Sequence, residues 1–200
     1  MRLIGVVKTV AADMVREAVA LGLEDLGENR VQEAEAKIVA VGRKAVRWHM
    51  IGHVQRNKAG RVAELFDCVH GVDSLALAQA LSRRATSARA TLPVLIEVNI
   101  SGESSKFGVA PDALESLLEP MATLEGLDLR GLMTVGRPVE NAEDARGDFA
   151  RLRELRDRAQ ARLGRELPEL SMGMSGDFEV AVEEGATMVR VGTALFGPRE

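Results

Sequence analysis

Lys8 follows directly on a short aliphatic run near the start of the chain. Four of the five residues from Leu3 to Val7 are aliphatic, which is typical of a strand buried on both faces in a parallel sheet. An ammonium group at the end of such a strand costs free energy unless it reaches water or serves a site. Lys8 therefore either extends past the sheet into solvent, or is a partly desolvated amine of lowered pKa that attacks a carbonyl to form a Schiff base.

Two glycine-containing turns near the end of the chain could bind an anion. Residues 172–176 supply flexible backbone, the hydroxyl of Ser175 and the expected start of a helix, and residues 191–194 place Gly192 beside Thr193. Exposed backbone N–H groups in such turns suit a phosphate dianion, although each turn alone is also an ordinary chain reversal. Together with a lysine, the two turns describe a site for an aldehyde that carries a phosphate.

The histidines and the single cysteine give weaker signals. His49 and His53 have the i, i+4 spacing of a helical metal pair, but the segment between them predicts a strand that turns into a loop. We therefore expect them to line a ligand or to bond the backbone, and we expect no metal site. His70 is interpreted as a structural histidine and Cys68 as an inert buried thiol. The polar loop 101–108 lacks the spacing of a P-loop and is expected to form a rim above the site.

Short apolar runs alternate with amphipathic stretches along the whole chain, without a linker or a break in composition. Strands are predicted at residues 3–7, 24–27, 46–51, 67–72, 93–100, 127–133, 170–174 and 186–191. Helices are predicted at residues 11–21, 29–41, 57–66, 74–85, 111–122, 141–163 and 177–184, with Asp73 as the N-cap of the fourth and Pro111 in the first turn of the fifth. Eight strands that alternate with helices favour a closed parallel barrel.

We therefore predict an α/β fold in which residues 1–200 form a single (β/α)8 TIM-type barrel domain. Chemistry in such barrels gathers at the carboxyl ends of the strands, where the sequence places Lys8, Glu28, Asn29, His49, Asn99, Met133, Thr134, Ser175, Arg190, Gly192 and Thr193. The chain opens on a strand and stops just past the last one, which leaves seven helices for eight strands. We expect either an absent upstream helix or an exposed apolar groove outside the first and last strands.

Composition excludes several classes of function. The formal net charge is −4 without a basic stripe, which argues against nucleic acid as a partner. No run is apolar enough to cross a membrane and no signal peptide opens the chain. One cysteine cannot form an internal disulfide and suits the cytoplasm. A monomer is expected because no surface stripe indicates an interface.

Five segments together resemble the pyridoxal phosphate homeostasis proteins, also called the YggS/PROSC group. They are residues 7–9, 26–33, 48–58, 171–175 and 189–197, which match in order from residue 3 to the end. The resemblance implies a barrel like the N-terminal domain of alanine racemase and a cofactor, pyridoxal 5′-phosphate (PLP), bound to Lys8 as a Schiff base. It also implies that Arg190 faces the pyridine nitrogen, that Ser175, Gly192 and Thr193 hold the phosphate, and that Asn29 and His49 line the ring.

Two features depart from this family. Val7 stands where the family usually has serine, so a polar contact from that position is lost. Members usually carry an N-terminal helix before the first strand, which agrees with the cover that this chain is expected to lack.

The residue types favour a PLP-binding protein over an enzyme. A pyridine nitrogen that accepts a hydrogen bond from the always protonated Arg190 does not itself hold a proton, and PLP is then a poor electron sink. Racemisation needs a second acid or base; the related racemases use a tyrosine from an extra domain, and this chain has no tyrosine. We expect a role in intracellular PLP homeostasis with PLP-dependent apoenzymes as possible recipients. A racemase-like enzyme, or a Schiff-base aldolase acting on a sugar phosphate without PLP, are the alternatives.

Overall fold

The computed structural model describes residues 1–88 and 90–197, and within them eight parallel strands form a closed barrel. Strands that follow one another in the chain are neighbours in the sheet, and β8 pairs with β1 to close it. The strands are β1 (Arg2–Val6), β2 (Asp25–Glu28), β3 (Arg47–Met50), β4 (Cys68–Val72), β5 (Leu92–Glu97), β6 (Leu127–Met133), β7 (Glu169–Ser171) and β8 (Met188–Val191). The predicted (β/α)8 barrel is confirmed.

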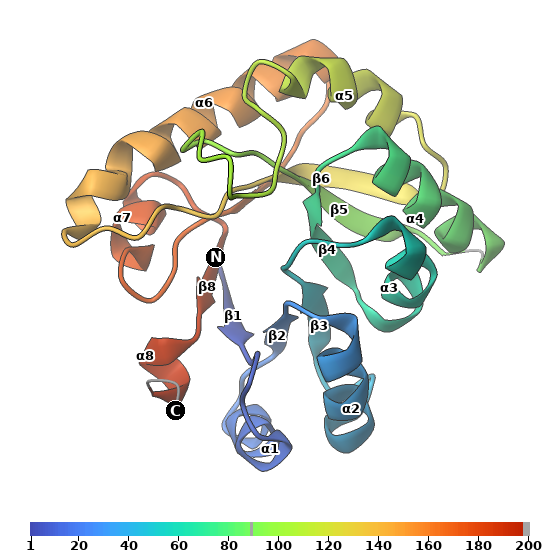
Figure 1. Cartoon of the computed structure of the whole chain (residues 1–200), viewed down its shortest axis with the longest axis vertical. Helices are drawn as coiled ribbons and strands as arrows, with labels where there is room; N and C mark the ends of the chain where they lie inside the picture. The colour runs from blue at the N-terminus through green and yellow to red at the C-terminus, as the bar shows by residue number, and fades with distance from the viewer. Residues whose placement is uncertain (89, 198–200) are drawn as a thin grey trace.

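The helices lie around the outside of the strands (Figure 1). They are α1 (Ala12–Ala20), α2 (Val31–Val41), α3 (Ala59–Leu65), α4 (Leu75–Ser87), α5 (Leu114–Ala122), α6 (Arg146–Leu163), α7 (Phe178–Glu183) and α8 (Thr193–Phe196), with 3₁₀ turns η1 (Arg56–Lys58) and η2 (Ala142–Ala145) before α3 and α6. In the described part of the chain, no helix has the length and apolarity needed to cross a membrane.

Three of the differences between the predicted and the observed elements concern the starts of helices. The N-cap of α4 is Ser74, whose Oγ accepts a hydrogen bond from the N–H of Leu77, whereas the carboxylate of Asp73 lies 3.0 Å from His53. Helix α5 begins three residues later than predicted because residues 111–113 form a separate turn. A one-turn helix, α8, follows β8 where no helix was predicted, since four residues are too few to show a helical period.

Apolar surface is exposed beside the first strand. Leu3 and Met14 are both exposed, and a hollow of about 350 Å³ between the start of α1 and α8 is lined in part by Val10, Met14 and Phe196. An exposed groove in this place was one of the two outcomes expected from the sequence.

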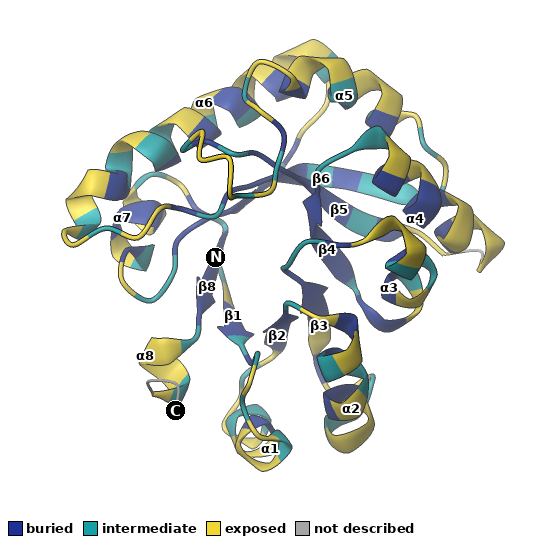
Figure 2. Cartoon of the chain, in the orientation of Figure 1, coloured by how far each residue is buried: buried dark blue, intermediate teal, exposed yellow. Residues whose placement is uncertain are grey.

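The side chains of each strand alternate between the helices and the interior of the barrel. The larger apolar cluster fills the layer between strands and helices and includes Trp48 and Phe149, both fully buried. Cys68, Leu95 and Met133 form a small apolar cluster that is separate from the larger one. Figure 2 shows the consequence, with the strands mostly buried and the helices exposed on their outer faces.

Gly131 of β6 is a position where the barrel tolerates no side chain. A Cβ atom there would lie 1.8 Å from the carbonyl oxygen of Glu169 on the paired strand β7. We expect Gly131→Ala to lower the free energy of unfolding by about 1–3 kcal/mol or more, because backbone has to move. Gly147 in α6 has no atom within 4 Å of its added Cβ, so Gly147→Ala should raise stability by up to about 1 kcal/mol. Urea denaturation of both variants checks this, and equal effects would contradict it.

Candidate functional site

A cavity of about 250 Å³ opens at the carboxyl end of the barrel. Side chains of a strand alternate between its two faces, so Ile4, Val6 and then Lys8, just after β1, lie on the same face. Ile4 pairs with Arg190, which places the end of β8 next to them. Six of the seven predicted site residues line this cavity together, namely Lys8, Asn29, Ser175, Arg190, Gly192 and Thr193. Val6, Ile51, Val135, Met174 and Gly176 complete its wall.

The backbone on either side of Lys8 is fixed by neighbouring groups. The Nζ of Lys37 on α2 donates a hydrogen bond of 2.5 Å to the carbonyl oxygen of Val7 and another of 2.5 Å to Oε1 of Glu28. Thr9 has a φ of 65°, in the left-handed region that β-branched residues rarely adopt. Its hydroxyl donates to the carbonyl oxygen of Lys8 over 2.6 Å. The amine of Lys8 is therefore presented from a rigid turn.

Sequence reasoning missed the buried pair of Lys37 and Glu28. Burial raises the pKa of the Glu28 carboxyl, and the hydrogen bond from Lys37 opposes that shift. The signal was present, because Lys37 falls on the predicted apolar face of α2 beside Ala34 and Ile38. A lysine in such a stripe needs a buried acceptor, and the end of β2 supplies one.

Arg190 lies in the floor of the cavity with 4% of its surface exposed. Its Nη1 donates to Oγ of Ser171 over 2.6 Å and its Nη2 to the carbonyl oxygen of Thr134 over 2.8 Å. Among the described residues no carboxylate forms an ion pair with it. Burial lowers the pKa of this guanidinium to about 10, so it remains cationic at neutral pH.

Backbone N–H groups converge on the side chain of Ser175, which lines the same cavity as Arg190. The N–H groups of Gly192 and Ala194 donate to Oγ of Ser175 over 3.2 and 3.3 Å. The preceding loop is fixed by Asp177, whose carboxylate accepts a 2.6 Å hydrogen bond from the N–H of Met174. Two N–H donors of the 191–194 turn thus meet the hydroxyl of the 172–176 turn at one point, an arrangement that suits an anion.

The structure places His49 below the cavity, where it does not line the wall. Its side chain is buried in the barrel interior, with Nε2 2.8 Å from Asp25 and Nδ1 3.0 Å from Nε2 of His70. His49 was expected to line a ligand ring, but its side chain lies in the barrel interior and not in the cavity wall. Its strand continues through Met50 to Ile51, and Ile51 is the residue of that strand's inward face that reaches the cavity.

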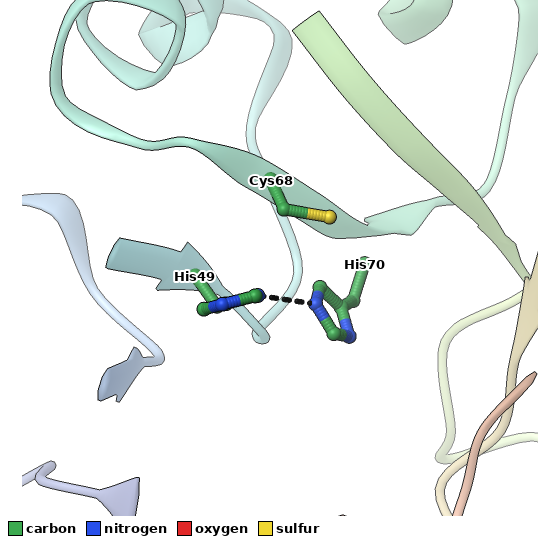
Figure 3. Close-up of side chains that lie close together, drawn as sticks. All are labelled: His49, Cys68 and His70. Carbon is green, nitrogen blue, oxygen red and sulfur yellow. Dashed lines mark hydrogen bonds between the residues drawn. The ribbon is translucent and has the colours of Figure 1, made fainter. Parts of the chain in front are cut away.

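His49, Cys68 and His70 form the only group in the described residues dense enough to consider for a metal (Figure 3). Nδ1 of His49 and Nε2 of His70 are hydrogen-bonded to each other, and the other ring nitrogens are bonded to Asp25 and Ser171. Burial raises the pKa of the Cys68 thiol to about 12, which keeps it protonated and a poor ligand. These side chains are satisfied without an ion.

A second cavity of about 510 Å³ adjoins the first and shares Asn29, Ile51 and Val135 with it. The carboxylate of Glu97 lines this cavity, and its Oε2 is buried without a hydrogen-bond partner. Phe107 covers the other side, where it stacks on His53 with 3.9 Å between ring centroids. The predicted rim loop 101–108 therefore contributes to the wall of this second cavity.

Known proteins resemble the whole chain. The family model for the N-terminal domain of alanine racemase matches residues 1–200. The chain is 48% identical over 198 residues to the pyridoxal phosphate homeostasis protein of Pseudomonas aeruginosa and 45% identical over 199 residues to that of Aquifex aeolicus. These alignments cover 99% and 100% of this chain and 84% and 87% of the relatives. The chain belongs to the pyridoxal phosphate homeostasis protein family.

A solved member of this family has the same fold. PipY of Synechococcus elongatus, in a structure with PLP bound, is 38% identical to this chain with a TM-score of 0.91, over 98% of this chain and 92% of PipY. The family resemblance noted in the sequence is thereby confirmed. Val7, the departure from the family pattern, is fully buried, and its carbonyl oxygen receives Lys37.

Glu97 should make stability depend on pH. Burial, followed by the charge of Asp73, raises the pKa of Glu97 to about 7 from an ordinary value of 4.5, while Arg190 partly opposes the shift. Between these values the folded state binds more protons than the unfolded state, so stability falls as pH rises. Glu97→Gln removes this loss, which amounts to up to about 3 kcal/mol at pH 8.

Urea denaturation of the wild type and Glu97→Gln between pH 4.5 and pH 8 measures the effect. The stability difference should grow in favour of the variant as pH increases, and Glu140→Gln, at an exposed position, should show no such growth. Parallel curves for wild type and Glu97→Gln would contradict the prediction.

Proposed function

We propose that this protein binds PLP in the cavity at the mouth of the barrel, through a Schiff base with Lys8, and holds it for intracellular PLP homeostasis. One observation carries the proposal: a single cavity unites the amine of Lys8, the N–H groups that converge on Ser175, and the buried cation of Arg190. These three features fit an aldehyde, a phosphate and an aromatic nitrogen in one molecule. PLP supplies the reactive aldehyde; the chain supplies the amine, the anion contacts and a hydrogen-bond donor.

The remaining residues have defined parts in this site. Ser175 donates to a phosphate oxygen once that oxygen replaces its hydroxyl as acceptor for the N–H groups of Gly192 and Ala194. Thr193 adds a second hydroxyl, and Asn29 lines the wall near the ring. The rigid turn around Lys8 keeps the amine at a fixed place relative to the two phosphate-binding turns.

We infer that the protein stores and releases PLP without catalysing turnover of amino acids. Arg190 is an obligate donor, so the pyridine nitrogen it contacts accepts and stays unprotonated, which weakens carbanion stabilisation. The sequence contains no tyrosine to act as the second acid or base of a racemase. We place its action in the cytoplasm, as a monomer that passes PLP to apoenzymes, and the solvent-open cavity suits such transfer.

Attachment to Lys8 is tested by reduction with borohydride. The wild type, incubated with PLP and reduced, should gain the mass of one reduced adduct on the peptide that contains Lys8. Lys8→Ala should gain none, whereas Lys44→Ala, which removes an exposed lysine before β3, should label as the wild type does. A full adduct on Lys8→Ala would contradict the proposal, and exchange of the α-hydrogen of alanine by the wild type would favour a racemase-like enzyme.

The phosphate contacts are tested by comparing PLP with pyridoxal, which lacks the phosphate. Ser175→Ala removes one hydrogen bond to a charged group, so its affinity for PLP should fall by about tenfold or more. Its affinity for pyridoxal should stay near the wild-type value. Absorbance titration measures both, and an equal loss for the two ligands would mean that Ser175 does not contact the phosphate.

A further inference from the structure

A row of side-chain hydrogen bonds crosses the interior of the barrel beneath the cavity. It runs from Arg190 to Ser171 (2.6 Å), from Ser171 to His70 (2.9 Å), from His70 to His49 (3.0 Å) and from His49 to Asp25 (2.8 Å). The five residues come from β8, β7, β4, β3 and β2, and all are buried. Figure 3 shows the central link between the two imidazole rings.

The chemistry of the two ends fixes the direction of every bond. Arg190 can only donate, so Oγ of Ser171 accepts and its own hydrogen points to Nδ1 of His70. His70 then carries its proton on Nε2 and donates it to Nδ1 of His49. His49 in turn carries its proton on Nε2 and donates it to the carboxylate of Asp25.

The far end of the row stays ionised. Burial alone would raise the pKa of Asp25, but hydrogen bonds from Arg47 and His49 outweigh it and hold that pKa well below the ordinary value. Arg47 donates to both carboxylate oxygens over 2.7 Å. Asp25 is therefore an acceptor at neutral pH, as the direction of the bonds requires.

If the hydrogen bonds of the row ran in the opposite direction, the buried histidines would have to hold one additional proton. His49 would have to be an imidazolium, and His70 would donate from Nδ1 to Ser171, whose hydroxyl hydrogen would then lose its acceptor. Burial lowers the pKa of His70 well below its usual value, so this ring is neutral and has a single proton to place. The row therefore has one arrangement that satisfies all its atoms.

We propose that Ser171, His70 and His49 are positioning residues that aim the guanidinium of Arg190 at the ring nitrogen of the ligand. The aligned bonds connect the buried cation of Arg190 to the buried anion of Asp25, and each link polarises the next. They also leave the Arg190 end able only to donate. The inference rests on the proposed function, because that function supplies the ring nitrogen that Arg190 faces. The arrangement of protons in the row is independent of the proposed function.

The proton arrangement is tested in the ligand-free protein by NMR of ¹⁵N-labelled histidine. The chain has three histidines, so the signals of His49 and His70 are separated from that of His53 with a His53→Gln variant. Both buried rings should be neutral, protonated on Nε2, with Nδ1 accepting a hydrogen bond. A ring protonated on Nδ1, or an imidazolium at neutral pH, would overturn the proposal whatever the protein binds.

The positioning role is tested with PLP labelled with ¹⁵N in the ring. Ser171→Ala breaks the row next to Arg190; it should shift the ring ¹⁵N resonance and weaken PLP binding about 3- to 10-fold. Ser82→Ala is the matched control, since its buried hydroxyl donates to the carbonyl oxygen of Glu125 on the outside of the barrel. It should change stability but neither readout.

An unchanged ring resonance and affinity in Ser171→Ala would overturn the positioning role and leave the row a support for folding. If the wild type fails to bind PLP at all, the histidine NMR still decides the proton arrangement. Failure of the proposed function is thus distinguished from failure of this inference.

Discussion

The site depends on a cation buried without a carboxylate beside it. Removing a guanidinium from water costs several kcal/mol, and the barrel compensates Arg190 with a carbonyl oxygen, a hydroxyl and, through the histidines, a distant anion. Such compensation needs acceptors from several strands at one depth. Only a closed barrel brings β2, β3, β4, β6, β7 and β8 around one interior point.

The same register that surrounds Arg190 places the amine above it. Pairing of β1 with β8 puts Ile4 beside Arg190, and two further steps of alternation bring Val6 and then Lys8 to the mouth. A shift of one residue would turn Lys8 away from the cavity and toward the helices. The close approach of β6 to β7 at Gly131 belongs to the same geometry, since the register of these two strands pairs Gly131 with Glu169 and Met133 with Ser171.

Much of the fold was predictable, because the alternation of apolar runs with amphipathic helices can be read locally in the sequence. Eight such repeats predict a closed barrel of parallel strands. Lys8, Ser175 and Gly192 could be found as strand-end residues. How deep a side chain lies inside the barrel could not be predicted, because it depends on the stagger between strands. For this reason His49 was expected beside the ligand. Lys37 on the apolar face of α2 was a signal for a buried acceptor, but helical periodicity does not identify Glu28, which lies in a different element, as that acceptor.

The left-handed turn at Thr9 has a consequence for how the amine of Lys8 can move. A threonine held there stores about 1–2 kcal/mol, and it persists only because its neighbours leave the main chain no alternative. The backbone of Lys8 is therefore fixed, and the amine moves only by rotation about the bonds of its own side chain. Movement of this amine is therefore confined to one side chain, while the strands beneath it stay in register.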